Sequence, residues 1–196
     1  MVVLLLAVFV LKVLSPEKLK GYAFSMFSKT FIEDEIEEDT SFFNPFQSIL
    51  FLFSILVLSL VIFNLSIHFK GVTIRSFSNF CIYFGGIFGY IMLKWLLEYV
   101  FSLLFLIKKP IRFFLVSKSS YLYSVSFYLF IVIILVEYSQ LNYNSLIYIS
   151  IALFSIRFLL HIINNKKLIF SKLFYFILYL CAFEIAPLLI LFKLMF

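Results

Sequence analysis

The sequence is poor in charge and in the residues that build metal and catalytic sites. Only 13% of its 196 residues are charged, against about 25% in an average soluble domain. It holds two cysteines, Cys81 and Cys181, and two histidines. A disulfide framework or a metal site needs more such ligands at fixed spacing, so we interpret both cysteines as buried thiols and expect no metal and no cofactor.

Catalytic motifs are missing as well. The chain has no H-E-x-x-H, no G-x-S-x-G and no P-loop. These absences predict that the protein is not an enzyme.

Apolar residues make up 64% of the chain. A soluble domain of this size buries only about 70% of its surface, so lipid is the solvent that such a composition suits. A membrane-spanning helix needs about 20 mostly apolar residues. Five runs reach or approach this length: 46–69, 77–107, 121–136, 144–163 and 170–196. The sequence therefore predicts an all-α, polytopic bundle of five to six transmembrane helices with additional interfacial segments.

The sixth candidate is the N-terminal run 2–14, which as a helix would rise about 20 Å against a hydrocarbon core of about 30 Å. A signal peptide is the alternative, but the run lacks a basic n-region and an A-x-A cleavage site. We expect a short anchor helix over 1–14. It precedes a polar segment over 15–45 and a five-helix core over 46–196, all within one membrane-embedded domain.

The segment 15–45 is the only long polar stretch. Its part 21–32 is aromatic and partly basic, which suits the bilayer interface. An acidic block follows, in which like charges repel one another and stay solvated. We interpret this block as a binding site for a basic partner; its members are Glu33, Asp34, Glu35, Glu37, Glu38 and Asp39. Asn44 and Pro45 are then suited to cap and begin the next helix.

Basic residues predict the orientation. Between 107 and 120 the chain is expected to break at Pro110 and lie on the membrane surface. With that division, eleven of the sixteen Lys and Arg lie in connections on one side of the membrane and three on the other. The positive-inside rule places the richer side in the cytoplasm, so the acidic block is cytoplasmic and the C-terminus periplasmic. This distribution favours a bilayer over nucleic acid as the partner.

Lys94 and Glu98 are charges within a predicted span. Charges near the bilayer centre cost at least about 2.5–3.5 kcal/mol on insertion scales. The two residues are four apart and so lie on one side of a helix. They are either a self-neutralising pair or part of a polar cavity.

Arg157 and His161 are likewise four apart, in the next-to-last run. Arg157 keeps its charge and so needs a partner, and Glu184 of the last run is the predicted one. Pro187 should kink that last helix beside Glu184. The contact is either a structural clasp or a proton or anion relay in which His161 titrates near neutrality.

Gly85 and Gly89 form a G-x-x-x-G pattern within an apolar run. Glycines at this spacing allow helix backbones to approach closely. We expect them to pack against another helix, within this chain or in a partner protein.

The last run carries the sequence FYFILYLCAFEIAPLL at 174–189. Together with LSP at 14–16, FNPF at 43–46 and LKWLL at 93–97, it resembles a family of small multi-pass inner-membrane proteins of Bacteroidota whose domain has no known function. The resemblance implies a bacterial inner-membrane location and no established activity. The Glu and Pro of the family signature match Glu184 and Pro187.

Two functions remain in view. The first is a non-enzymatic subunit or assembly factor of a cell-envelope complex, such as secretion or gliding machinery, with the bilayer and other envelope proteins as partners. The alternative is a proton-coupled transporter or ion-conducting protein that uses the intramembrane Arg, His and Glu.

Overall fold

A computed structural model describes residues 1–26, 31, 32, 34, 44–70, 77–104, 108–139 and 143–164. Those residues contain no strand, and six helices are placed among them. The all-α prediction is confirmed for this part of the chain. The helices are α1 (Val2–Leu14), α2 (Pro16–Ala23), α4 (Pro45–Lys70), α5 (Phe77–Leu104), α6 (Lys108–Tyr138) and α7 (Tyr143–Asn164).

The predicted start of α4 is confirmed. Pro45 is its first residue, and the backbone N–H of Phe46 donates to Asn44 Oδ1 at 3.4 Å. Asn44 thus satisfies one of the amides that a helix N-terminus leaves without an internal partner.

The corner between α1 and α2 also follows from local chemistry. A residue before proline is driven out of the helical region by the proline ring. Ser15 is accordingly extended, with φ −162° and ψ 95°, and Pro16 opens α2. The chain therefore turns sharply at Ser15 without a glycine.

The prediction of a break at Pro110 is wrong. Pro110 is the third residue of α6, which continues unbroken from Lys108 to Tyr138. The first four amides of a helix have no internal acceptor, so proline costs no hydrogen bond in this turn. The stretch 107–120 is therefore not a separate surface segment, because from Lys108 onward it is the first part of α6.

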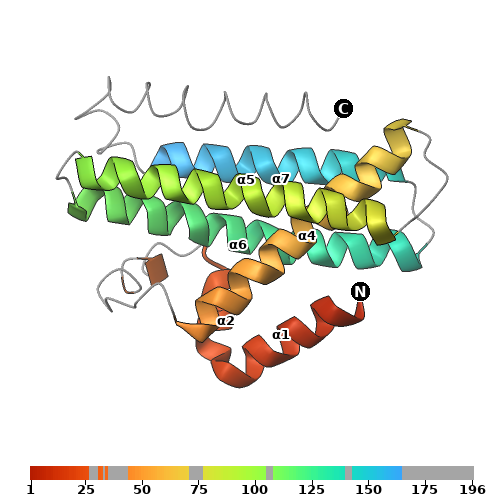
Figure 1. The fold of residues 1–196 in the computed structure, drawn as a ribbon. Coiled ribbons are helices and arrows are strands. Elements are labelled where there is room, and N and C mark those ends of the chain that lie inside the picture. Colours follow the sequence, from red (N-terminus) through yellow and green to blue (C-terminus); the bar gives the residue numbers. More distant parts are fainter. Residues whose placement is uncertain are drawn as a thin grey trace.

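Helix α4 crosses the other long helices obliquely and organises the fold (Figure 1). It packs against α1, α5 and α6, while α6 also packs against α2 and α7. The connection of four residues between α6 and α7 makes these two helices antiparallel neighbours.

The core lies between α4 and α6. Tyr121, Val125, Leu129 and Ile133 form a buried stripe along α6 at four-residue spacing, which is the spacing of one helix face. They meet buried residues of α4 such as Phe53, whose ring lies 5.6 Å from that of Phe130 in α6.

A second cluster joins α1, α2 and α4 around Tyr22. Only 2% of Tyr22 is exposed, and its ring lies 5.0 Å from that of Phe31, 5.9 Å from Phe46 and 5.7 Å from Tyr123. Met26 and Ile32 are also buried in the main core. The segment predicted to lie at the bilayer interface thus contributes several side chains to the protein interior.

Three helices are long and apolar enough to cross a membrane: Pro45–Ile67 of α4, Phe77–Leu96 of α5 and Val116–Tyr138 of α6. Val2–Leu14 and Asn144–Leu160 are shorter apolar helices. The predicted number of five to six spans is thus reached by three full-length candidates and two short ones, and the run 170–196 lies outside the described residues.

Candidate functional site

Asp34 is the member of the acidic block that the structure describes, and it is exposed. Glu33, Glu35, Glu37, Glu38 and Asp39 lie outside the described residues. Exposure of Asp34 agrees with a solvated block, and partner binding by the block stays a prediction.

Arg157 is half-buried on α7, and its Nη2 donates to the backbone carbonyl of Lys118 in α6 at 3.4 Å. Glu184 and Pro187 lie outside the described residues, and so does the side chain of His161. The Arg157–Glu184 contact therefore stays a prediction. What the structure adds is a backbone acceptor for this guanidinium on the neighbouring helix.

Lys94 is half-buried on α5, with its Nζ 5.9 Å from the centroid of the Tyr90 ring. This separation lies within the range of a cation–π contact. The side chain of Glu98 is outside the described residues, so its pairing with Lys94 stays a prediction.

Helix α5 buries very little of itself. Within Phe77–Leu96, Ile87 is the one buried residue. Phe84 and Ile91 pack beside it on the core. The opposite side of the helix is exposed and is here named the α5 outer face; it consists of Ile82, Gly85, Gly86, Gly89, Leu93 and Leu96.

The glycines of this face meet nothing. A Cβ added to Gly85, Gly86 or Gly89 would have no heavy atom within 4 Å. Close helix approach at Gly85 and Gly89 is thus not made by any described helix. Cys81 lies one turn before Gly85 and is exposed, so the interpretation of Cys81 as a buried thiol is wrong for the described fold; α5 turns its other side to α4. Cys181 lies outside the described residues.

A cluster of polar groups links α2, α6 and α7, and the sequence did not reveal it. We name it the polar seam; it consists of Ser25, Ser117, Lys118, Ser120, Ser124 and Arg157. Ser25 Oγ donates to the Ser120 carbonyl at 3.0 Å, and Ser124 Oγ donates to the Ala23 carbonyl at 2.7 Å. Lys118 is only 9% exposed.

The seam had one signal in the sequence. Ser117, Ser120 and Ser124 are spaced by three and four residues, which places them on one face of a helix. The predicted break at Pro110 assigned two of them to a surface segment, and so their common face was missed. Chemically the seam joins helices through hydroxyl and guanidinium donors and backbone acceptors.

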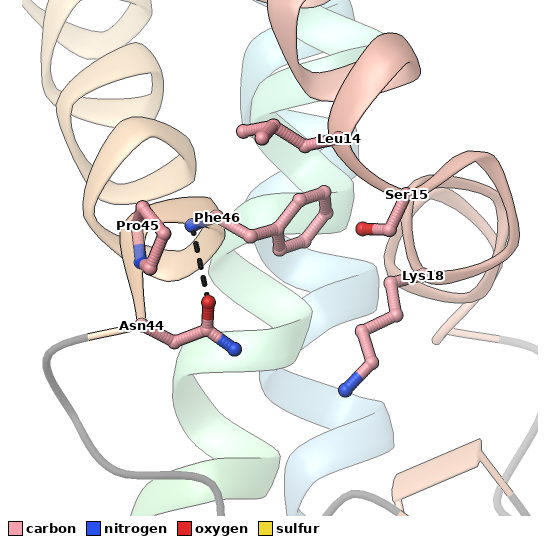
Figure 2. A pocket seen from close by; sticks show the side chains of 6 residues that line it. All are labelled: Leu14, Ser15, Lys18, Asn44, Pro45 and Phe46. Atoms are coloured by element: carbon pink, nitrogen blue, oxygen red, sulfur yellow. Dashed lines mark hydrogen bonds between the residues drawn. The ribbon is translucent and has the colours of Figure 1, made fainter.

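A small cleft opens where the corner of α1 and α2 meets the start of α4 (Figure 2). Its volume is about 200 Å³, and it is lined by Leu14, Ser15, Lys18, Asn44, Pro45 and Phe46. The Ser15 oxygen is buried and has no hydrogen-bond partner among the residues that the structure describes. Within that same part of the chain, no three His, Cys, Asp or Glu residues lie together as a metal site would require.

Comparison with known families agrees with this lack of catalytic geometry. The model of a family described as "Domain of unknown function (DUF4271)" matches residues 1–195. The chain belongs to the DUF4271 family. Membership confirms the expected relation to a family without an assigned activity. No curated protein and no solved structure matches the chain.

Proposed function

We propose that this DUF4271 protein is a non-enzymatic, multi-pass subunit or assembly factor of an envelope complex in a bacterial inner membrane. The observation that carries the proposal is the α5 outer face, which is apolar, rich in glycine and uncovered by the other described helices. We propose further that this face docks a membrane-spanning helix of another envelope protein.

Lipid chemistry supports this kind of contact. Apolar side chains gain little by leaving lipid for protein, so helices associate in membranes through close packing between small residues. Gly85, Gly86 and Gly89 leave the backbone of α5 open to such packing. A helix that buries one residue of its span against its own chain therefore keeps most of its packing surface for a neighbour.

The dimensions of the face fit a spanning partner. From Ile82 to Leu96 it rises about 21 Å along the helix, which is some two-thirds of a hydrocarbon core of about 30 Å. The face carries no charged residue. A helix from a soluble protein would bring polar side chains against this surface, whereas an apolar spanning helix would not.

Orientation and lineage complete the proposal. With Lys118 placed inside α6, the basic connections still hold ten Lys and Arg on one side against three on the other. This bias supports a cytoplasmic acidic block that can bind a basic partner, and a periplasmic C-terminus. A source in Bacteroidota, and a role in secretion or gliding machinery, rest on the sequence resemblance.

The test uses a photoreactive residue at position 82 in the full chain, expressed in its own membrane. We expect one envelope protein to crosslink, and Gly86→Leu to abolish that crosslink by blocking close approach. Gly86→Leu should leave the fold intact, because a Cβ there has open space. The matched control is Ala152→Leu, which adds the same bulk at an exposed position of α7 and should keep the crosslink.

Two results would overturn the docking proposal. Crosslinks that form only within the chain, to residues 165–196, would show that the protein covers this face itself. Recovery of the chain alone after gentle purification would remove the envelope-complex proposal as a whole.

The alternative function is transport of protons or ions. It is favoured by one observation, the buried Lys118 beside the contact of its carbonyl with Arg157, because intramembrane charges commonly mark ion pathways. Glu184→Gln and Arg157→Gln should then abolish flux in proteoliposomes. Unchanged flux in both variants would exclude this alternative.

A further inference from the structure

The cleft beside Ser15 is lined by hydrogen-bond donors and contains no carboxylate. Lys18 contributes an ammonium group with three donors, and Ser15 contributes a hydroxyl. The Oδ1 of Asn44 accepts from Phe46 N–H, so its amide nitrogen is the end of the side chain that remains to donate, and it is turned toward Lys18 (Figure 2). Donors from two segments far apart in the sequence therefore converge on one space.

Ser15 is the most informative of these groups. It stands at the N-cap of α2, where serine normally accepts a hydrogen bond from the first turn of its helix, yet it makes no such side-chain bond. Its oxygen is buried without a partner among the described residues. Figure 2 shows this oxygen directed into the cleft beside the Phe46 ring. A buried hydroxyl without an acceptor costs about 1–3 kcal/mol, so an acceptor in the cleft would remove a standing penalty.

Two helices begin at the cleft. Ser15 precedes α2 and Asn44 precedes α4, and each helix N-terminus carries a partial positive charge. Helix N-termini are common binding sites for phosphate groups. The one nearby carboxylate of the described residues, Glu17, is exposed and does not line the cleft.

The position of the cleft indicates where its ligand would come from. Pro45 and Phe46 are the first residues of the candidate span Pro45–Ile67. The cleft therefore lies at the end of a membrane-spanning helix, at the depth of lipid headgroups. Lys12 and Lys20 are exposed on the same two short helices, and they raise the local positive potential.

We propose that this cleft binds a phosphate group, presented by the headgroup of an anionic phospholipid or by a soluble phosphate. Ser15 and Asn44 donate hydrogen bonds to the phosphate oxygens, and Lys18 neutralises their charge. The volume of about 200 Å³ holds several water molecules, and a phosphate group would replace part of that water. The proposal does not depend on the α5 outer face, so either can fail without the other.

The test measures lipid binding to the purified full chain by native mass spectrometry. Phosphatidylglycerol, which carries net negative charge, is compared with phosphatidylcholine of the same acyl chains. We expect saturable binding of phosphatidylglycerol that Lys18→Gln weakens about tenfold, as expected for one charge-assisted hydrogen bond. Ser15→Ala leaves every charge in place and should weaken binding about threefold.

Lys20→Gln is the matched control, since it removes the same charge from an exposed position of the same helix. It should change the affinity less than twofold. Inorganic phosphate distinguishes the two sources: competition with phosphatidylglycerol in the wild-type protein indicates that soluble phosphate enters the cleft, and resistance indicates a lipid ligand. Equal losses for Lys18→Gln and Lys20→Gln would overturn the proposal, as would the absence of saturable binding of either phosphate source.

Discussion

Two serine hydroxyls join α2 to α6, and replacing each by alanine should cost different amounts of stability. Ser25 Oγ donates to the Ser120 carbonyl at 3.0 Å, and Ser124 Oγ donates to the Ala23 carbonyl at 2.7 Å. Both serines are buried, and alanine removes the hydroxyl from each without adding bulk. The difference lies in the acceptors.

The Ser120 carbonyl lies in the interior of α6, where it also accepts the amide four residues later. Ser25→Ala therefore removes a second bond from an acceptor that keeps its first, and about 0.6 kcal/mol is expected. Ala23 is the last residue of α2, and the last four carbonyls of a helix have no internal donor. Ser124→Ala leaves this acceptor without its one donor among the described residues, and about 1–3 kcal/mol is expected.

The assay is unfolding of the purified protein in mixed micelles, followed by circular dichroism. A loss of 2 kcal/mol corresponds to a fall in Tm of roughly 4–8 °C for a chain of this size. The control is Ser126→Ala, because Ser126 is buried on the same helix but bonds within it, to the Leu122 carbonyl at 2.9 Å. If Ser25→Ala cost as much as Ser124→Ala, or Ser126→Ala cost as much as either, the reasoning from acceptors would be refuted.

Two further predictions concern the two hydrophobic clusters. Tyr22→Ala should cost about 3–5 kcal/mol, because it removes the ring that contacts three aromatic neighbours; Tyr22→Phe should cost under about 1 kcal/mol, since its hydroxyl accepts only a long 3.4 Å bond from Gln47, and equal losses in the unfolding assay would contradict this. Leu129→Ala should cost about 2–5 kcal/mol, because Leu129 is fully buried. Leu135→Ala, at a position 51% exposed on the same helix, should cost far less, and similar values would show that the core is not where the structure places it.

The helices themselves were largely predictable from sequence. Apolar runs beginning at positions 2, 46, 77 and 144 correspond to α1, α4, α5 and α7, within one or two residues at their starts. The start of α4 was the most specific success, since Asn44 and Pro45 each have one well-defined role at a helix N-terminus. The start of α6 was missed because proline was taken as a break without regard to its place in the first turn.

Packing partners were less predictable than helices. Hydropathy cannot distinguish a helix that lines the core from one that faces lipid, because both are apolar throughout. Helices α5 and α6 both qualify as candidate spans, yet Ile87 alone is buried in the span of α5, whereas α6 carries a continuous buried stripe. That difference depends on where α4 crosses the other helices, which is a tertiary property.

Polar contacts were the hardest to predict, and Arg157 shows the reason. A search by charge looks for a carboxylate, and it selected Glu184 because the two runs are neighbours in sequence. The structure gives the guanidinium a backbone carbonyl, that of Lys118 on the helix packed against it. A guanidinium has five donors and every helix residue offers a carbonyl, so the set of possible acceptors is much larger than the set of acidic residues. The same holds for Ser25 and Ser124, whose acceptors are also carbonyls. In an apolar chain the backbone is the most abundant polar partner, and residue types alone do not show where one helix presents it to another.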